Sequence, residues 1–147
     1  ATYMAYDPAR RLERQWFANP VAGESADSPI YYTYDQVGNL LTSDDSLAGL
    51  GVSVFEYDEL DRVTKKVTVA GPVYYSYDQA GRLSQLVNLD STASQLTYFA
   101  YQRNPNGAVT RINHESNEWT YFTYDALDRL TEERRTQNPT IYGFEYE

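Results

Sequence analysis

The residues of this chain that could do chemistry are aspartates in a recurring Tyr-Asp pair. They stand at Asp7, Asp35, Asp58, Asp78 and Asp125. General acid–base catalysis by carboxylates needs two of them to converge, and calcium needs six or more oxygens gathered at one point. Single aspartates at equivalent positions of separate repeats provide neither arrangement. We therefore expect these aspartates to cap turns, and we predict no catalytic residue, no metal ligand and no cofactor.

Two other groups could carry chemistry, and each has a simpler interpretation. Asp44-Asp45 lies in a Ser-Asp-Asp-Ser segment and could touch a cation, but a solvated loop is the favoured interpretation. His114 is the single histidine, and a catalytic triad needs a histidine oriented beside a nucleophile. Its surroundings, Ile-Asn-His-Glu-Ser-Asn, are typical of a reverse turn, so a surface-loop histidine is expected. We predict that the chain is not an enzyme.

The elements that position the aspartates are tandem copies of one segment, best seen from Tyr121 to Leu130. Self-similarity of this kind indicates a repeat architecture. We predict a single array of about six repeats over residues 1–147. The copy at Tyr101 is degenerate, because Gln102 replaces the aspartate and the glycine is delayed to Gly107. The anchors are Tyr6, Tyr34, Tyr57, Tyr77, Tyr101 and Tyr124, with a truncated copy at Tyr146.

Each copy predicts a strand followed by a tight turn. A large apolar residue lies two positions before each anchor and so shares a strand face with it. The aspartate suits the first position of a type I turn, and glycine or aspartate suits the left-handed fourth position. Arg10 holds that position in the first copy, so a looser first turn or a turn of another type is expected. The predicted turn residues are Asp7, Asp35, Gly38, Asp58, Asp61, Asp78, Gly81, Asp125 and Asp128.

The fold class that follows is all-β, with tandem hairpins stacked as an open solenoid or curved sheet. A single hairpin is marginally stable in water, so each must be covered by the next. No stretch of useful length has helical periodicity, and residues 9–17 fit the second strand of the first repeat. The free strand edges should pair with further repeats of a parent chain or with another copy of this chain.

Four tyrosines are expected on the other face of their strands, at Tyr31, Tyr74, Tyr98 and Tyr121. They are the candidates for contact with a ligand, because aromatic rings can stack on sugars. A carbohydrate- or protein-binding module is therefore the alternative hypothesis. The favoured interpretation is that the paired aromatic residues of each repeat form the core between repeats.

Composition excludes some classes of partner. The formal charge is −9, which disfavours nucleic acid and anionic membranes because both attract positive surfaces. No apolar run approaches the roughly 20 residues of a membrane span, so no membrane insertion is expected, and there is no cysteine for disulfides. No signal peptide stands at Ala1, and we expect the chain to be a processed or excised piece.

The pattern Tyr-x-Tyr-Asp-x-x-Gly-Arg-Leu, as in Tyr75 to Leu83, resembles the YD repeat, also called the Rhs repeat. This repeat occurs in bacterial Rhs and wall-associated polymorphic toxins, in B and C components of insecticidal toxin complexes, and in teneurins. The resemblance covers essentially the whole chain. It implies a hollow β shell that encloses a toxin or its own C-terminal segment, and a structural role without catalysis.

The resemblance also implies a location for the parent protein, which would be secreted or on the cell surface. Family shells contain many more repeats than this chain. The Asp-Pro core motif that ends such shells is absent, since Asp7-Pro8 is an ordinary repeat turn. We therefore expect a fragment of a shell wall, with an encapsulated toxin or a glycan as further candidate partners.

Overall fold

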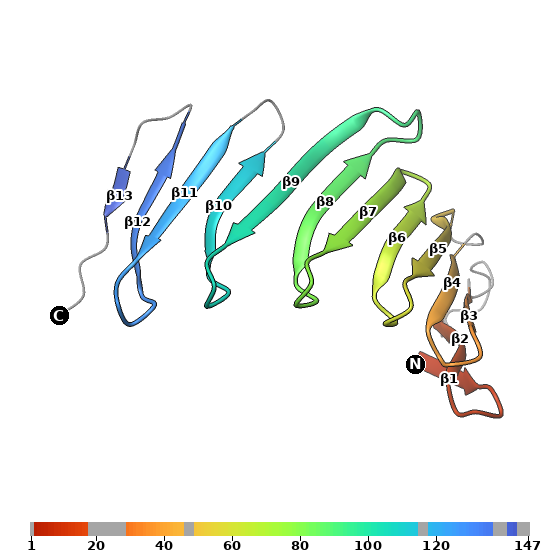
Figure 1. Ribbon diagram of the computed structural model, residues 1–147. Helices are drawn as coiled ribbons and strands as arrows, with labels where there is room; N and C mark the ends of the chain where they lie inside the picture. Colours follow the sequence, from red (N-terminus) through yellow and green to blue (C-terminus); the bar gives the residue numbers. More distant parts are fainter. Residues whose placement is uncertain (1, 18–28, 46–48, 115–117, 137–140, 144–147) are drawn as a thin grey trace. The chain divides into compact units, whose positions relative to one another are not determined.

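A computed structural model describes residues 2–17, 29–45, 49–114, 118–136 and 141–143 (Figure 1). These residues form thirteen β-strands and no helix, so the all-β prediction is confirmed. None of the described segments is therefore a helix that could cross a membrane. The first six strands are β1 (Thr2–Tyr6), β2 (Leu12–Phe17), β3 (Ile30–Tyr34), β4 (Leu40–Asp45), β5 (Gly51–Tyr57) and β6 (Val63–Thr68). The others are β7 (Gly71–Tyr77), β8 (Leu83–Leu89), β9 (Gln95–Arg103), β10 (Val109–His114), β11 (Trp119–Tyr124), β12 (Leu130–Arg135) and β13 (Ile141–Gly143).

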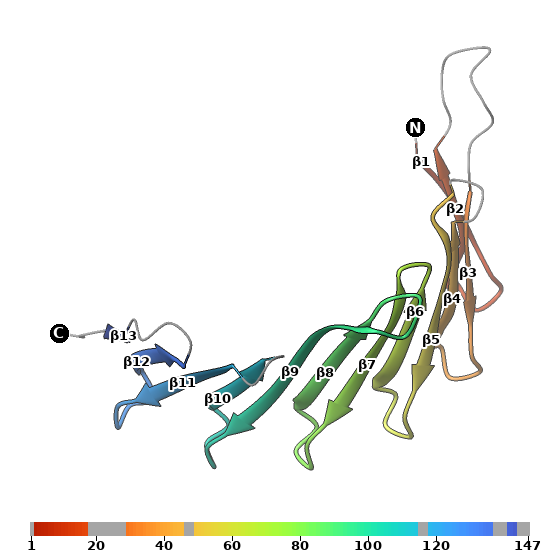
Figure 2. The ribbon, with the colours of Figure 1, turned by 90° about the horizontal axis from the view of Figure 1, so that it is seen from above.

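The chain divides into two compact units, Ala1–Pro72 and Val73–Glu147. Within each unit every strand pairs antiparallel with the strands before and after it in the sequence. The strands of each unit therefore lie in chain order, as successive hairpins, and Figure 2 shows the same order from above. The stretch from residue 9 that the sequence places in a strand contains β2. The truncated copy at Tyr146 lies outside the described residues.

A register shift of one kind recurs where a strand reaches its repeat turn. In β1 and β2, Ala5 is opposite Arg14 but Tyr6 is opposite Leu12, so Glu13 is an extra residue. The corresponding shift falls just before the anchor tyrosine in the pairs β3–β4, β5–β6, β7–β8 and β11–β12. This is the bulge that accompanies a type I turn with a left-handed fourth residue.

The fold has no conventional hydrophobic core among the described residues. None of their apolar side chains is fully buried, and Thr120 is the single buried polar residue, at 3% exposure. The paired aromatics of the repeats are half-buried in most copies, whereas Met4 and Tyr6 of the first copy are exposed. A single layer leaves both sheet faces partly open, so backbone pairing and contacts between adjacent repeats must supply most of the stability.

The hairpin connections opposite the repeat turns also meet one another. Gly51 begins β5 with a φ of +77°, and a Cβ at this position would overlap Cγ1 of Val69. Gly49 has nearly the same conformation, with a φ of +78°, but a Cβ there would meet no atom within 4 Å. The two glycines therefore share a backbone requirement and differ in their surroundings.

We expect Gly51→Ala to destabilise the protein more than Gly49→Ala. Both variants force an alanine into the left-handed region, at a cost of about 1 kcal/mol, and Gly51→Ala adds overpacking of about 1 kcal/mol or more. Urea unfolding of both variants measures the difference. Val69→Ala in the Gly51→Ala background should restore the added loss, and equal losses for the two single variants would contradict the proposed contact.

Candidate functional site

The recurring aspartate organises each repeat turn through its backbone and its carboxylate. At Asp58, the backbone N–H donates to the carbonyl of Arg62 at 2.9 Å, and the N–H of Asp61 donates to the carbonyl of Asp58 at 3.1 Å. The Asp58 carboxylate accepts the N–H groups of Leu60 and Arg62, both at 3.0 Å. One carboxylate oxygen thus satisfies two turn donors that no strand partner could reach.

An arginine four residues after the aspartate closes the turn. The Arg62 Nε donates to Oδ2 of Asp58 at 2.8 Å, in a half-buried ion pair. Charge-assisted bonds of this kind are stronger than neutral ones. No role for this arginine was predicted from the sequence, although an arginine stands four residues after the aspartate in four of the five Tyr-Asp copies. The same pair occurs as Asp7–Arg11, Asp78–Arg82 and Asp125–Arg129, with Nε–Oδ2 distances of 2.7, 2.8 and 2.7 Å.

The residue three positions after the turn aspartate adopts a left-handed conformation whatever its type. Gly38 and Gly81 have φ values of +106° and +78°, and Asp61 and Asp128 both have +57°. Arg10 has a φ of +64°, and its N–H donates to the Asp7 carbonyl at 2.9 Å as in the other turns. The expectation of a looser first turn is therefore wrong, because the bonds to Asp7 outweigh the modest strain of a left-handed arginine.

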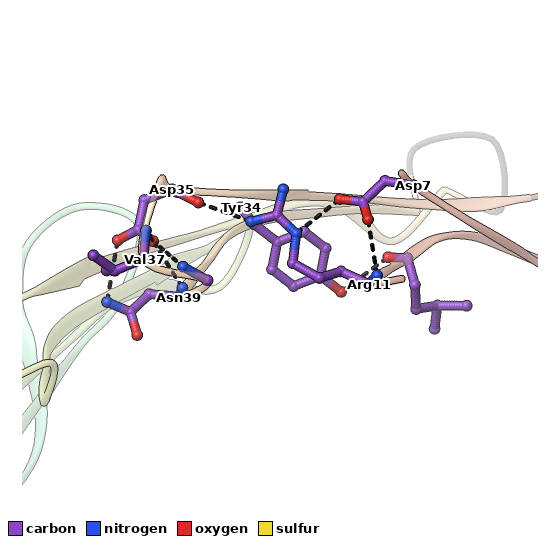
Figure 3. Close-up of polar contacts among 8 residues, drawn as sticks. Asp7, Arg11, Tyr34, Asp35, Val37 and Asn39 are labelled. Carbon is purple, nitrogen blue, oxygen red and sulfur yellow. Dashed lines mark hydrogen bonds and ion pairs between the residues drawn. The ribbon is translucent and has the colours of Figure 1, made fainter. Parts of the chain in front are cut away.

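The first turn is also joined to the next repeat, as Figure 3 shows. The Nη1 of Arg11 donates to the backbone carbonyl of Asp35 at 2.8 Å, and its guanidinium lies 4.8 Å from the centre of the Tyr34 ring. In return, the Tyr34 hydroxyl donates to the carbonyl of Leu12 at 2.9 Å. Arg11 thus ties its own turn to the tyrosine and aspartate of the following repeat.

The tyrosine-to-carbonyl bond recurs in other copies. Tyr57 donates to the Leu40 carbonyl at 2.8 Å, and Tyr124 donates to the Val109 carbonyl at 2.7 Å. In each case the acceptor is the first strand residue after the preceding turn. Burial raises the pKa of the Tyr34, Tyr57 and Tyr124 hydroxyls, as expected for phenols enclosed between neighbouring repeats.

The degenerate copy differs from the prediction in its alignment. Its turn begins at Asn104, whose N–H donates to the Ala108 carbonyl at 3.0 Å and whose side chain accepts the Ala108 N–H at 2.9 Å. Arg103, not Tyr101, therefore occupies the position before the turn. The Nη1 of Arg103 donates to the Leu83 carbonyl at 2.7 Å, which is the bond that tyrosine makes elsewhere.

Side chains at the turn tips link adjacent turns where the usual residues are replaced. Asn39 stands where arginine stands in other copies, and its Nδ2 donates to Asp35 at 3.1 Å and to Asp61 at 2.7 Å. Asn106 likewise donates to both carboxylate oxygens of Asp128 at 3.2 Å. Asp61 and Asp128, predicted only as substitutes for glycine, thus also accept bonds from the preceding turn.

A further aspartate turn, which the sequence analysis missed, connects β8 to β9. Asp90 accepts the N–H groups of Thr92 and Ser94 at 2.8 and 3.0 Å, and Ala93 takes the left-handed position with a φ of +65°. No tyrosine precedes Asp90 and no glycine follows it, so the repeat pattern gave no signal. The spacing from Asp90 to the small polar residues Thr92 and Ser94 was the remaining indication.

The other candidates for chemistry lie on strands, not in loops. His114 ends β10 half-buried, with Nε2 2.9 Å from Oγ1 of Thr120 and its ring edge-on to Phe99. Asp44 and Asp45 end β4 and are half-buried. The loop interpretations of these three residues are therefore wrong, because backbone pairing extends through their polar segments. In the described ranges, no three histidine, aspartate or glutamate side chains gather where they could hold a metal.

The four tyrosines predicted on the opposite face divide into two pairs. Tyr31 and Tyr74 are exposed, at 41% and 40%. Tyr98 and Tyr121 are half-buried, and the guanidinium of Arg134 lies 5.0 Å from the centre of the Tyr121 ring. The structure therefore presents Tyr31 and Tyr74 most openly.

The six aspartates that occupy the first position of a turn share a lowered carboxyl pKa, although the leading contributions differ. At Asp58 the hydrogen bond from the Arg62 side chain lowers the carboxyl pKa most. Desolvation raises this pKa, and the hydrogen bonds from the turn N–H groups lower it further. At Asp35 desolvation raises the carboxyl pKa, but hydrogen bonds from N–H donors, chiefly those of Asn39, together lower it by more. Hydrogen bonds likewise lower the pKa at Asp7, Asp78, Asp90 and Asp125.

We expect stability to fall as the solution is acidified below about pH 4, the ordinary aspartate pKa. A folded-state pKa below the unfolded value contributes stability above the unfolded pKa, and this contribution is lost as pH falls through the folded pKa. Thermal unfolding between about pH 7 and 2.5 measures the loss. Asp78→Asn should make the acid slope shallower, since it removes one of the groups. A flat profile in this range would contradict the assignment.

We expect Tyr57→Phe to destabilise the protein by about 0.5–1.5 kcal/mol, because the Leu40 carbonyl loses its donor. Tyr31→Phe is the matched control, since the exposed Tyr31 makes no such bond among the described residues. Urea unfolding compares the two variants. If Tyr31→Phe lowered the free energy of unfolding as much as Tyr57→Phe, the hydroxyl-to-carbonyl bond would not be what links the repeats.

A family model described as Teneurin YD-shell matches residues 6–147. The Photorhabdus luminescens Tc holotoxin pore with a TccC3 mutation is similar at a TM-score of 0.62 and 15% identity, over 92% of this chain and 9% of that chain. The TcdB2-TccC3-Cdc42 structure is similar at 0.64 and 16%, over 97% and 8%. No curated protein matches. At this identity the structures establish the fold alone, and this chain spans less than a tenth of each.

Proposed function

Since the chain belongs to the teneurin YD-shell family, we propose that it is a non-catalytic wall segment of a larger shell that encloses a polypeptide. The observation that carries this proposal is that the side chains of the turn aspartates already form hydrogen bonds and ion pairs within the fold. In the described turns, the aspartate carboxylates accept turn N–H groups, and four of them also hold an arginine. A carboxylate bound in this way is ill-suited to acid–base work.

The links between repeats support extension of the wall. A tyrosine hydroxyl reaches the carbonyl just after the preceding turn in three copies, and Arg103 makes the equivalent bond in the degenerate copy. These four copies therefore offer a donor to the repeat before them. Tyr6 of the first copy is 57% exposed, and its hydroxyl lies 3.4 Å from Sδ of Met4. We infer that Tyr6 donates to the carbonyl of a preceding repeat, supplied by the parent chain or by another copy of this chain.

The content of the shell and its location belong to the same proposal. The similar solved structures are named as a Tc holotoxin pore with a TccC3 mutation and as TcdB2-TccC3-Cdc42. We infer by analogy that the parent of this chain encloses a toxin segment and is secreted or displayed at the cell surface. The turn residues from Asp7 to Asp128 then serve the wall, and no cofactor is needed.

Limited proteolysis of the full-length protein that carries these residues tests the proposal. The wall should protect the enclosed segment, and the double variant Asp58→Ala, Asp78→Ala should expose it by opening two turns. Glu59→Gln is the matched control, because this exposed turn side chain faces solvent. Cleavage of the segment at the same rate in all three proteins would contradict enclosure by this wall.

A further inference from the structure

Each unit contains one tryptophan, and the guanidinium of an arginine lies over the ring of each tryptophan. The guanidinium carbon of Arg14 lies 4.5 Å from the centre of the Trp16 ring, and that of Arg111 lies 3.7 Å from the centre of the Trp119 ring. Arg14 is directly opposite Tyr31 in the register of β2 and β3. Arg111 is likewise opposite Tyr121 in β10 and β11. The arrangement thus occurs once in each unit.

These arginines lie on the face opposite the anchor tyrosines. Tyr31 and Tyr34 are three residues apart on one strand, so their side chains point to opposite faces. Because Arg14 is directly opposite Tyr31, it shares the Tyr31 face. The repeat-turn arginines differ from these two, because each forms an ion pair with the aspartate that follows the anchor tyrosine of its turn.

Arg14 and Arg111 have no acidic partner in the described part of the chain. No carboxylate there forms an ion pair with Arg14 or Arg111. In addition, Nε of Arg111 is buried without a hydrogen-bond partner. Stacking on an aromatic ring occupies only the face of a guanidinium and leaves its N–H edge available. Such an edge matches the two oxygens of a carboxylate.

A hollow lies beside Arg14 and has a volume of about 240 Å³. The described residues that line it are Ala5, Glu13, Arg14 and Tyr31. Ala5 is directly opposite Arg14 in the register of β1 and β2 and provides a small floor, and Glu13 is the extra residue of the bulge. Tyr31 is 41% exposed and forms a side of the hollow.

We propose that this hollow binds a single aspartate side chain of the polypeptide that the shell encloses, a partner that rests on the proposed function. The Arg14 edge takes the carboxylate, Glu13 accepts the backbone N–H next to it, and Tyr31 and Ala5 cover its methylene group. A volume below the roughly 300–1,000 Å³ of small-molecule pockets suits one side chain. The chain's formal charge of −9 repels dense polyanions and leaves an isolated carboxylate as the better ligand.

Titration of the 147-residue chain with short peptides, followed by amide NMR shifts, tests the proposal. The probes are acetyl-Gly-Asp-Gly-amide and its asparagine counterpart. The aspartate peptide should shift the resonances of Ala5, Arg14 and Tyr31 and bind at least about tenfold more tightly than the asparagine peptide, as loss of a charged hydrogen bond implies. This measurement needs no shell, so it can fail or succeed independently of the proteolysis of the parent.

Arg14→Gln should weaken the binding of the aspartate peptide by a similar factor. Arg111→Gln changes the arginine beside the tryptophan of the other unit, and it should leave the peptide-induced shifts of Ala5 and Tyr31 unchanged. Arg14→Lys keeps the charge without the planar edge and should also weaken binding, which provides a second test if Arg14→Gln unfolds. Equal binding of the two peptides, or unchanged binding by a folded Arg14→Gln, would overturn the proposal. Tighter binding of D-glucuronate than of the peptide at the same residues would also overturn it, in favour of an acidic saccharide.

Discussion

The carboxylate at each repeat turn is the interaction on which this fold depends. A single-layer sheet whose described apolar side chains all remain partly exposed cannot rely on an enclosed core. It must hold its strands in register at the turns, where backbone donors would otherwise be unpaired. In the five Tyr-Asp turns one aspartate satisfies those donors, and the arginine or asparagine four residues later fixes the carboxylate. The left-handed residue between them sets the bulge and hence the register.

The same turn connects each hairpin to its neighbour. Arg11 shows the principle, because it binds its own Asp7 and also reaches the Asp35 carbonyl and the Tyr34 ring. Local order and contact between repeats therefore come from the same side chains, which is how a repeat array gains stability from nearest neighbours. These polar side chains form hydrogen bonds and ion pairs within the fold, and this accounts for the recurrence of aspartate and tyrosine along the chain. In the proposed shell, the Tyr31 face remains available for contact with an enclosed polypeptide.

Much of this architecture could be predicted from the sequence, because the Tyr-Asp pair and the following Gly38 or Gly81 have local conformational causes. The ion pair between the turn aspartate and the arginine four residues later could not be deduced as easily, because it depends on how the bulge directs Arg62 back toward Asp58. The alignment of the fifth copy failed for a physical reason: Arg103 can make the carbonyl bond of a tyrosine, and Asn104 can make part of the aspartate turn. His114 and Asp44 were misplaced because polar composition suggests a loop even where strand pairing continues.

Amide hydrogen exchange in Asp58→Asn tests the central claim most directly. Asparagine keeps the shape of the side chain and one acceptor oxygen but loses the ion pair with Arg62. The account predicts faster exchange at Leu60 and Arg62 and also at Leu40 in the preceding repeat, because the carboxylate orders the turn next to the Tyr57 link. Unchanged protection at Leu60 and Arg62, with the protein folded, would contradict the claim that the aspartate holds the turn and its neighbour together.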